Sequence, residues 1–203
     1  MDFGCGSKPY KSLFKVDEYI GVDFAGEGHS HENEQIDVFY DGRHLPFPDD
    51  KFDSVFSSEV FEHVFNLPEI LLEINRVMKP GARLLFTCPF FWNLHETPND
   101  FARYTPYALN HILQEAGFKV LHQEQTGNSV LCLTQLFLLY FYTHFASKIK
   151  NRWFKRMLLI MVSTPVNLWG LLWSKLLPHG KDMYFNNVVL AQKNRAEPHL
   201  TTL

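Results

Sequence analysis

Apolar and polar positions alternate along the first two thirds of the chain in the way that short strands and amphipathic helices do. Helices are predicted over 67–78, which Lys79-Pro80-Gly81 ends, and over 105–116, which Gly117 closes. Strands are predicted where short apolar runs end at turn residues, over 19–23, 35–40, 52–57, 83–88 and 118–121, with a last one over 187–192. This alternation indicates a parallel α/β sheet that binds its ligands at the carboxyl ends of the strands.

The first six residues, M-D-F-G-C-G, are typical of a buried strand that ends in a glycine loop. Asp23 follows nineteen residues after Gly4. Glycines let the backbone approach a ligand closely, and an acid at this distance can accept hydrogen bonds from ribose hydroxyls, so the pattern indicates a nucleoside cofactor. Pro9 stands near the third glycine position of the dinucleotide fingerprint and disfavours a pyrophosphate there. A strand of two or three residues is short for a central position, so we expect the natural chain to begin upstream of Met1.

Two apolar segments interrupt the alternation before the last strand. Residues 130–146 and 157–174 contain no Asp, Glu, Lys or Arg, and the nine residues 148–156 between them carry five cations. We predict an α-helical hairpin over 126–182, inserted into a core formed by 1–125 and 183–194. The hairpin could lie on an anionic membrane with its basic tip and aromatic anchors, or pack on protein as a lid or a homodimer contact.

A true membrane span is disfavoured for both segments. Each apolar run barely reaches the ~20 residues that a span requires. The second run also contains Pro165, Asn167 and Gly170.

The formal net charge of −3 is unevenly distributed. From Gln125 through Lys181 there are seven Lys or Arg and no Asp or Glu, so the remainder carries 12 basic against 22 acidic residues. An acidic core disfavours a nucleic-acid partner. The cysteines Cys5, Cys88 and Cys132 lie in apolar contexts, which indicates a reducing compartment and neither disulfides nor a zinc site. With no secretory signal visible, we expect a cytoplasmic location, or one at the inner face of the membrane if the hairpin binds lipid.

Four sequence blocks in order resemble the class I S-adenosylmethionine-dependent methyltransferases, specifically the type 11 group. Residues 2–6 look like the D-x-G-C-G loop of that group, and 21–23 (G-V-D) look like the strand with the ribose-binding acid. Residues 45–55 are similar to its L-P-F-x-D-x-x-F-D-x-V block. Residues 73–81 resemble E-x-x-R-V-L-K-P-G-G, with Ala82 in place of the second glycine.

The resemblance covers about 1–121 and the last strand, and it implies both a fold and a cofactor. The fold is α/β, a Rossmann-like, doubly wound and mostly parallel seven-stranded sheet, with a shortened first strand and the helical hairpin before the last strand. An NAD-dependent dehydrogenase would explain only the first block. The implied cofactor is S-adenosylmethionine, bound by Asp2, Gly4, Gly6, Asp23, Asp41 and Ser58.

The resemblance also implies a role for each of these residues. The loop glycines pack against the methionine part of the cofactor, and Asp23 holds the ribose hydroxyls. Asp41 would lie near the adenine amino group, although a turn-capping acid is the alternative. Ser58 would lie near the sulfonium end, or cap a helix.

Methyl transfer is an in-line displacement, so the protein mainly aligns the acceptor and excludes water. A hydroxyl acceptor also needs its proton removed, for which His63 and His95 are candidates. We favour His95 as the catalytic base, since it lies in the aromatic segment 89–105 after the fifth strand; a histidine that orders this loop is the alternative. Glu59, Glu62 and His63 share one face of a predicted helix and could hold a divalent cation, but we expect a structural or substrate-positioning role and no metal.

Segment 89–105 places aromatic faces beside polar groups, which suits a polyhydroxy ligand. The leading hypothesis is therefore an S-adenosylmethionine-dependent O-methyltransferase that acts on a small-molecule or glycan acceptor. Two alternatives remain open. One is methylation of a quinone-like or lipid acceptor, and the other is a non-catalytic methyltransferase-like partner module.

Overall fold

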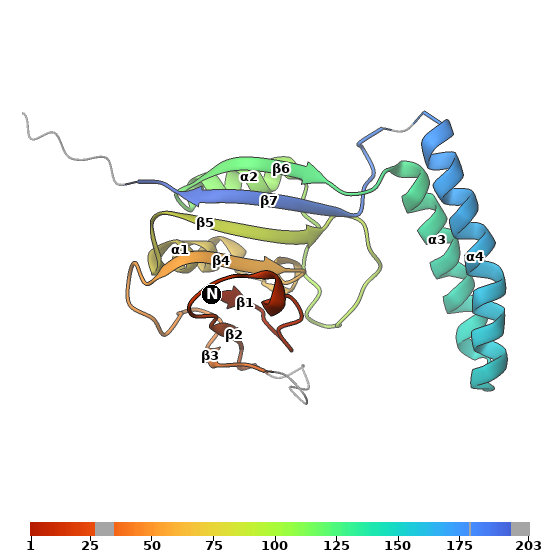
Figure 1. Ribbon diagram of the computed structural model, residues 1–203, viewed down its shortest axis with the longest axis horizontal. Helices are drawn as coiled ribbons and strands as arrows, with labels where there is room; N and C mark the ends of the chain where they lie inside the picture. Colours follow the sequence, from red (N-terminus) through yellow and green to blue (C-terminus); the bar gives the residue numbers. More distant parts are fainter. Residues whose placement is uncertain (27–34, 179, 196–203) are drawn as a thin grey trace, which may run out of the picture. The chain divides into compact units, whose positions relative to one another are not determined.

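The strands of the described chain form a seven-stranded sheet with the order β3-β2-β1-β4-β5-β7-β6 (Figure 1). In chain order they are β1 (Asp2–Phe3), β2 (Gly21–Phe24), β3 (Val38–Tyr40), β4 (Phe52–Ser58), β5 (Met78–Pro89), β6 (Phe118–Gln125) and β7 (Asn186–Lys193). Neighbouring strands from β3 to β5 pair in parallel, whereas β7 runs in the opposite direction in Figure 1. The predicted Rossmann-like, mostly parallel sheet is therefore confirmed.

The computed structural model describes residues 1–26, 35–178 and 180–195. The chain forms two compact units. We call Met1–Glu124 with Asn187–Leu203 the core unit, and Gln125–Asn186 the hairpin unit.

Strand β1 has only two residues but lies between β2 and β4. Asp2 pairs with Gly21 of β2 and with Phe56 of β4. The Phe3 side chain is fully buried and packs against Tyr40, with ring centroids 5.3 Å apart. The loop that follows β1 therefore starts at the centre of the sheet, at the carboxyl ends of its neighbours.

Helix α1 (Leu67–Val77) carries the apolar stripe that the sequence predicts. Its stripe residues are all buried: Leu67, Ile70, Leu71, Ile74 and Val77. Full burial of one such side chain contributes about 1.5–3 kcal/mol. Helix α2 (Pro106–Glu115) begins after Thr105, whose hydroxyl accepts a hydrogen bond from the Ala108 N–H at 3.2 Å. Both predicted helices are thus confirmed.

Arg76 of α1 joins two of the sequence blocks that carry the family resemblance, 45–55 and 73–81. Its Nε and Nη2 donate to the Glu73 carboxylate at 2.9 and 2.8 Å. Its Nη1 donates to Asp49 Oδ1 at 2.7 Å and to the Phe47 carbonyl at 2.9 Å. The Leu45 carbonyl accepts from Nη2 at 3.0 Å. The Glu73–Arg76 pair therefore fastens the turn before β4 to α1.

The chain between β4 and α1 differs from the prediction. In place of the helix expected to carry Glu59, Glu62 and His63 on one face, the structure has a single 3-10 turn, η2 (Phe61–His63). Glu59 has a φ of +55°, which no residue in a right-handed helix adopts. The chain therefore turns sharply at the end of β4, and Glu59 does not share a helix face with Glu62 and His63.

Strand β5 begins earlier than the predicted residue 83. Phe52 of β4 pairs with Met78, but Ser54 pairs with Arg83, so β5 has extra residues at this point. Gly81 lies in the extra segment with a φ of +81°, which glycine adopts without the clash of a Cβ atom. The Pro80-Gly81 sequence thus ends α1 and shapes a bulge instead of separating the helix from the strand.

The hairpin unit contains α3 (Ser129–His144), η3 (Ala146–Lys148) and α4 (Arg152–Leu176). Asn128 caps α3 by accepting from the Leu131 N–H at 3.1 Å, and Asn151 caps α4 by accepting from the Phe154 N–H at 3.0 Å. The predicted helical hairpin before the last strand is confirmed. Helix α4 continues through Pro165, so this proline does not shorten the apolar run.

Ser129–Lys148 and Arg152–Leu176 are both long and apolar enough to cross a membrane, by length and composition alone. They have 20 and 25 residues, and only 17% and 11% of their most apolar windows are buried. Core helices of a soluble protein would be mostly buried. The hairpin unit therefore exposes an apolar surface that the described chain does not cover.

Candidate cofactor and active site

A cavity of about 500 Å³ opens in the core unit at the carboxyl ends of β1, β2 and β4. This volume is in the range of small-molecule sites. Four residues predicted for the cofactor are among those that line it: Gly4, Gly6, Asp23 and Ser58. Asp2 and Asp41 are outside this lining, although Phe3 and Gly42 beside them belong to it.

The glycine loop and the acid after β2 are joined directly. Gly4 has a φ of +71°, and a Cβ atom at this residue would lie 2.3 Å from Val60 Cγ2. The Gly6 N–H donates to Asp23 Oδ2 at 3.0 Å, and the Phe24 N–H donates to Asp23 Oδ1 at 2.8 Å. A carboxylate has about four lone-pair positions, so these bonds from described residues leave two of them for a ligand in the cavity.

Asp2 lies behind this loop. Its side chain is 3% exposed and accepts a hydrogen bond from the Tyr19 hydroxyl at 2.6 Å. Burial raises the pKa of Asp2, and the Tyr19 hydrogen bond opposes this effect. In this structure Asp2 connects β1 to the segment before β2 and does not belong to the cavity lining.

Asp41 and Ser58 have internal partners as well. The Asp41 carboxylate accepts the N–H groups of His44 at 2.7 Å and Arg43 at 2.8 Å, and these bonds lower its pKa. This is the turn-capping arrangement that the sequence left open for Asp41. Ser58 Oγ lies 3.0 Å from Thr87 Oγ1, which links the ends of β4 and β5 beside the cavity.

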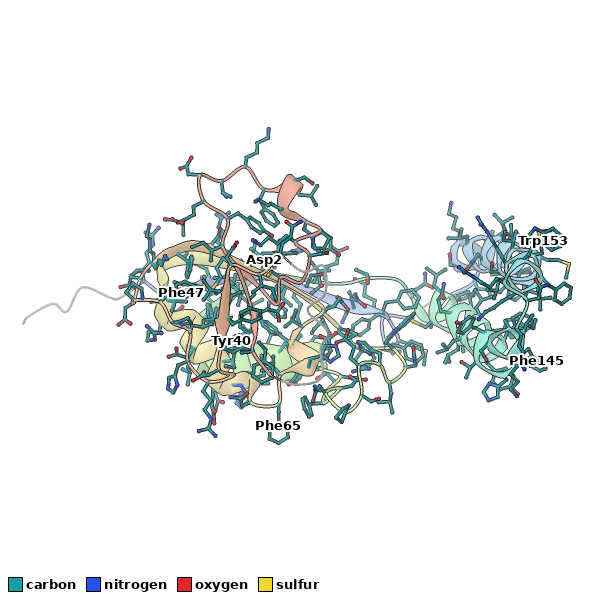
Figure 2. All side chains as sticks on the ribbon, turned by 90° about the horizontal axis from the view of Figure 1, so that it is seen from below. Asp2, Tyr40, Phe47, Phe65, Phe145 and Trp153 are labelled. Carbon is teal, nitrogen blue, oxygen red and sulfur yellow. The ribbon has the colours of Figure 1, made fainter. Side chains whose placement is uncertain are left out.

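Exposed aromatic side chains lie around the cavity. Phe24, Phe65 and Phe101 belong to the lining and are 42%, 81% and 46% exposed. Phe65, which extends outward in Figure 2, meets Phe101 edge-to-face with ring centroids 5.4 Å apart. These rings provide apolar contact surface for a purine or for the acceptor. From the segment 89–105, Glu96 and Asn99 also line the cavity.

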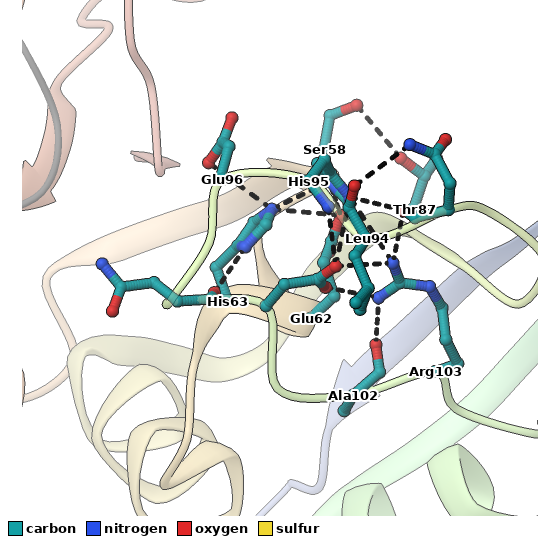
Figure 3. Close-up of polar contacts among 12 residues, drawn as sticks. Ser58, Glu62, His63, Thr87, Leu94, His95, Glu96, Ala102 and Arg103 are labelled. Atoms are coloured by element: carbon teal, nitrogen blue, oxygen red, sulfur yellow. Dashed lines mark hydrogen bonds and ion pairs between the residues drawn. The ribbon is translucent and has the colours of Figure 1, made fainter. Parts of the chain in front are cut away.

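His63 and His95 form a hydrogen-bonded pair at the side of the cavity (Figure 3). Their Nε2 atoms are 3.1 Å apart, and His63 Nδ1 lies 2.7 Å from the Asn99 carbonyl. A carbonyl only accepts, so His63 Nδ1 carries a proton and its Nε2 accepts from His95 when both rings are neutral. His63 belongs to the cavity lining and His95 does not, although the sequence favoured His95 as the base.

Glu62 lies beside both rings. Its side chain is 0% exposed, and its Oε1 is 3.7 Å from His63 Nε2 and 3.9 Å from His95 Nε2. Neither carboxyl oxygen has a hydrogen-bond partner among the described residues. Burial raises the pKa of Glu62 to about 8, because the charged form loses its water.

Asp100 and Arg103 hold the segment that carries His95. Asp100 Oδ2 accepts the His95 N–H at 3.0 Å and accepts from Arg103 Nη2 at 2.9 Å. The Arg103 guanidinium holds the pKa of Asp100 well below its usual range. Arg103 Nη2 also donates to the Asn93 carbonyl at 3.1 Å. The backbone is therefore held both at His95 and two residues before it.

Glu62, His63 and His95 also have the composition of a cation site. One ligand atom from each lies within 4.8 Å of the others. This set differs from the combination of Glu59, Glu62 and His63 that the sequence offered, because the turn at Glu59 separates that residue from the helix face on which it was expected. Two imidazoles and one carboxylate would suit a transition metal better than Mg²⁺ or Ca²⁺.

The core unit matches known methyltransferases in sequence. Residues 1–86 match the family model of the type 11 methyltransferase domain. Over 93 residues the chain is 30% identical to the malonyl-[acyl-carrier protein] O-methyltransferase of Erwinia pyrifoliae. That match covers 43% of this chain and 36% of the Erwinia protein, so the chain spans little more than a third of this relative.

Solved structures agree in fold. The S-adenosylmethionine-dependent methyltransferase of Mesorhizobium loti superposes with a TM-score of 0.54 at 13% identity, over 95% of this chain and 89% of that chain. Phosphoethanolamine N-methyltransferase 2 of Haemonchus contortus, solved with S-adenosyl-L-methionine, has a TM-score of 0.51 at 17% identity, over 96% of this chain and 48% of that chain. Residues 1–86 therefore match a methyltransferase domain, and the chain shares the fold of S-adenosylmethionine-dependent methyltransferases.

Proposed function

We propose that this chain transfers a methyl group from S-adenosylmethionine to an oxygen atom of a small-molecule or glycan acceptor. The observation that carries the proposal is that one cavity joins two kinds of residue. Gly4, Gly6 and Asp23 have the pattern of a nucleoside site, and His63 in the same lining belongs to a pair that can accept a proton.

The residues present fit S-adenosylmethionine. Asp23 keeps two lone-pair positions for the ribose hydroxyls after its bonds to Gly6 and Phe24. The positive φ of Gly4 turns the loop at the cavity without a side chain. Ser58 lines the same cavity, and we assign it to the sulfonium end of the cofactor, as the resemblance implies. When bound, the cofactor supplies an electrophilic methyl carbon.

The histidine pair supports a hydroxyl acceptor. Such a hydroxyl loses its proton as the new C–O bond forms, and a positioned base typically contributes 10²–10⁴-fold. His63 Nδ1 already carries a proton, so His63 Nε2 is the atom that takes the hydroxyl proton, in exchange for its hydrogen bond from His95. Glu96 Oε2 at 3.6 Å from His63 and Asp100 Oδ2 at 3.4 Å from His95 would stabilise the positive charge that results.

A carboxyl oxygen is the second candidate acceptor. The name of the Erwinia relative places its methyl group on an oxygen of a malonyl group. An ionised carboxylate has no proton to lose, so this reaction would not need the histidine pair. A quinone-like or lipid acceptor is the third candidate, which the apolar hairpin unit favours.

The test uses the full chain with trideuteromethyl S-adenosylmethionine and mass spectrometry of the acceptor. Methyl glycosides, a malonyl thioester and a quinol represent the three acceptor classes. Each is tested with the wild type, with His63→Gln, and with His111→Gln as a control on the exposed surface of α2.

We expect transfer to a hydroxyl acceptor that falls by about 10²–10⁴-fold in His63→Gln and stays unchanged in His111→Gln. Transfer to the malonyl thioester alone, unchanged in His63→Gln, would favour the second candidate. Cofactor binding without transfer to any of the three classes would contradict the proposal and favour a non-catalytic module.

A further inference from the structure

The outward surface of the hairpin unit is apolar on more than one side of each helix. Trp169 and Leu171 are 59% and 52% exposed. They stand two positions apart, about 200° around the helix axis, so α4 exposes apolar side chains on nearly opposite sides. On α3, the exposed positions Leu133, Leu136 and Phe137 continue this surface. A protein partner that packs on one face of the hairpin would leave the other faces in water.

Two buried hydroxyl groups of the hairpin are hydrogen-bonded within their own helices. Thr134 Oγ1 donates to the Val130 carbonyl at 2.8 Å, and Ser174 Oγ donates to the Leu171 carbonyl at 2.9 Å. The segments 129–147 and 157–174 contain no Asp, Glu, Lys or Arg. Hydrocarbon offers no partner to polar groups, so internal hydrogen bonding and the absence of charge are what a lipid environment requires.

The contact between the two helices has the form that helices use in lipid. Gly170 is buried, and a Cβ atom there would lie 2.5 Å from Thr134 Oγ1. Small residues that let two helices approach closely are typical of helix packing in membranes, where apolar side chains gain nothing by leaving the lipid.

The end of the hairpin at which α3 connects to α4, which we call the loop end, carries most of its positive charge. Five cations lie at this end: Lys148, Lys150, Arg152, Lys155 and Arg156. Phe145 and Trp153, labelled on the hairpin in Figure 2, are 56% and 72% exposed. Tyr142 lies under the Lys155 ammonium, 5.0 Å from ring centroid to Nζ. Cations beside exposed aromatic rings suit the headgroup layer of an anionic membrane.

The opposite end has a second aromatic group. Trp169 and Trp173 lie one turn apart with ring centroids 5.7 Å apart, and Lys175 follows them. At 1.5 Å per residue, the uncharged run 157–174 of α4 extends about 27 Å, and the hydrocarbon layer is about 30 Å thick. The apolar part of the hairpin thus has membrane dimensions with an aromatic group at each end.

We propose that the hairpin unit embeds in an anionic lipid bilayer and anchors this methyltransferase to it. The apolar sides of α3 and α4 contact the acyl chains, and the five loop cations bind anionic headgroups. This inference rests on the hairpin unit alone and holds whether or not the proposed methyl transfer occurs. A homodimer formed through the hairpin is the rival explanation.

The experiment uses the full chain with the substitution Trp92→Phe. The chain has four tryptophans, and those that remain, Trp153, Trp169 and Trp173, all lie in the hairpin. The protein is mixed with vesicles of phosphatidylcholine alone, or with 30% phosphatidylglycerol added, and vesicle flotation measures binding. Vesicles with brominated acyl chains then report by fluorescence quenching whether the hairpin tryptophans reach the hydrocarbon.

Two double substitutions distinguish the contribution of the loop cations to membrane binding from that of the apolar surface. Lys148→Gln with Lys150→Gln should weaken binding to anionic vesicles about 30-fold, at about 1 kcal/mol for each cation near the surface. Leu136→Glu with Phe137→Glu should abolish quenching. Leu13→Glu with Leu94→Glu, at exposed positions of the core unit, is the matched control and should change neither.

Flotation with anionic vesicles and quenching by brominated chains would support the proposal. A full-length protein that stays in solution with anionic vesicles would overturn it, whether sedimentation shows a monomer or a dimer. Flotation without quenching, and unchanged by the Leu136 and Phe137 substitutions, would also overturn it, because binding would then be electrostatic only. Circular dichroism confirms for each variant that the helices remain folded.

Discussion

Replacing Glu62 with glutamine should remove a pH-dependent cost of folding. The Glu62 side chain is fully buried, and neither of its carboxyl oxygens has a hydrogen-bond partner among the residues that the structure describes. Burial raises its pKa from 4.5 to about 8. Near neutral pH the folded protein therefore holds this group in its uncharged form, whereas the unfolded chain releases the proton.

The magnitude follows from the difference between the two pKa values. Below pH 4.5 Glu62 is protonated in both states, and its contribution to the free energy of unfolding is fully present. This contribution is lost as the pH rises towards about 8, because the unfolded chain releases the proton and the folded protein keeps it. Each pH unit in this window lowers stability by about 1.4 kcal/mol. Glutamine resembles the protonated acid and does not titrate. Relative to wild type, Glu62→Gln should therefore gain about 3 kcal/mol between pH 5 and pH 7.5.

Urea unfolding at a series of pH values measures this difference. The pH-independent cost of burying the amide of glutamine cancels when values at two pH conditions are subtracted. Glu18→Gln, at an exposed position of the core unit, is the control and should follow the wild type at every pH. A Glu62→Gln difference that stays constant across this range would refute the reasoning, since it would mean that the folded protein holds the carboxylate charged.

Two further substitutions test other parts of the core unit. Arg76→Ala should lower the free energy of unfolding by about 2 kcal/mol in urea titrations, because it removes the bidentate pair with Glu73 and the bonds to the turn before β4. A loss below 0.5 kcal/mol, on the order of an ordinary surface ion pair, would contradict this role. Gly4→Ala should weaken cofactor binding at least tenfold, at about 1–2 kcal/mol for the left-handed backbone plus the clash with Val60. Unchanged binding by a folded Gly4→Ala protein would show that the loop tolerates a side chain.

The fold and the cofactor half of the site could be predicted because their signals are local. The stripe of α1 needs only the helical spacing of Ile70, Leu71 and Ile74, which the sequence displays directly. The loop glycines follow β1 and Asp23 lies on the neighbouring strand β2, and the topology brings the ends of these strands together in any sheet of this kind. For Asp41 the sequence left two interpretations, and the bonds to Arg43 and His44 match the turn cap.

The histidine pair could not be predicted, because it depends on the path of the chain between β5 and α2. His63 and His95 are 32 residues apart, and the Arg103–Asp100 pair fixes the segment that brings His95 to His63. The turn at Glu59 could not be predicted from the sequence either, because a positive φ is uncommon for any residue other than glycine. Once this turn replaces the expected helix, Glu62 is buried beside the rings instead of sharing a face with Glu59.

Calorimetric titration with S-adenosylhomocysteine tests the central claim most directly, that the cavity beside Gly6 and Asp23 holds the cofactor. The titration compares the wild type with Asp23→Asn, and with Asp53→Asn as an exposed control that pairs with Lys79. We expect micromolar binding by the wild type and the control, and about 30-fold weaker binding by Asp23→Asn, on the scale of one lost charge-assisted hydrogen bond. Equal binding by Asp23→Asn, or no binding by a folded wild-type protein, would contradict the account.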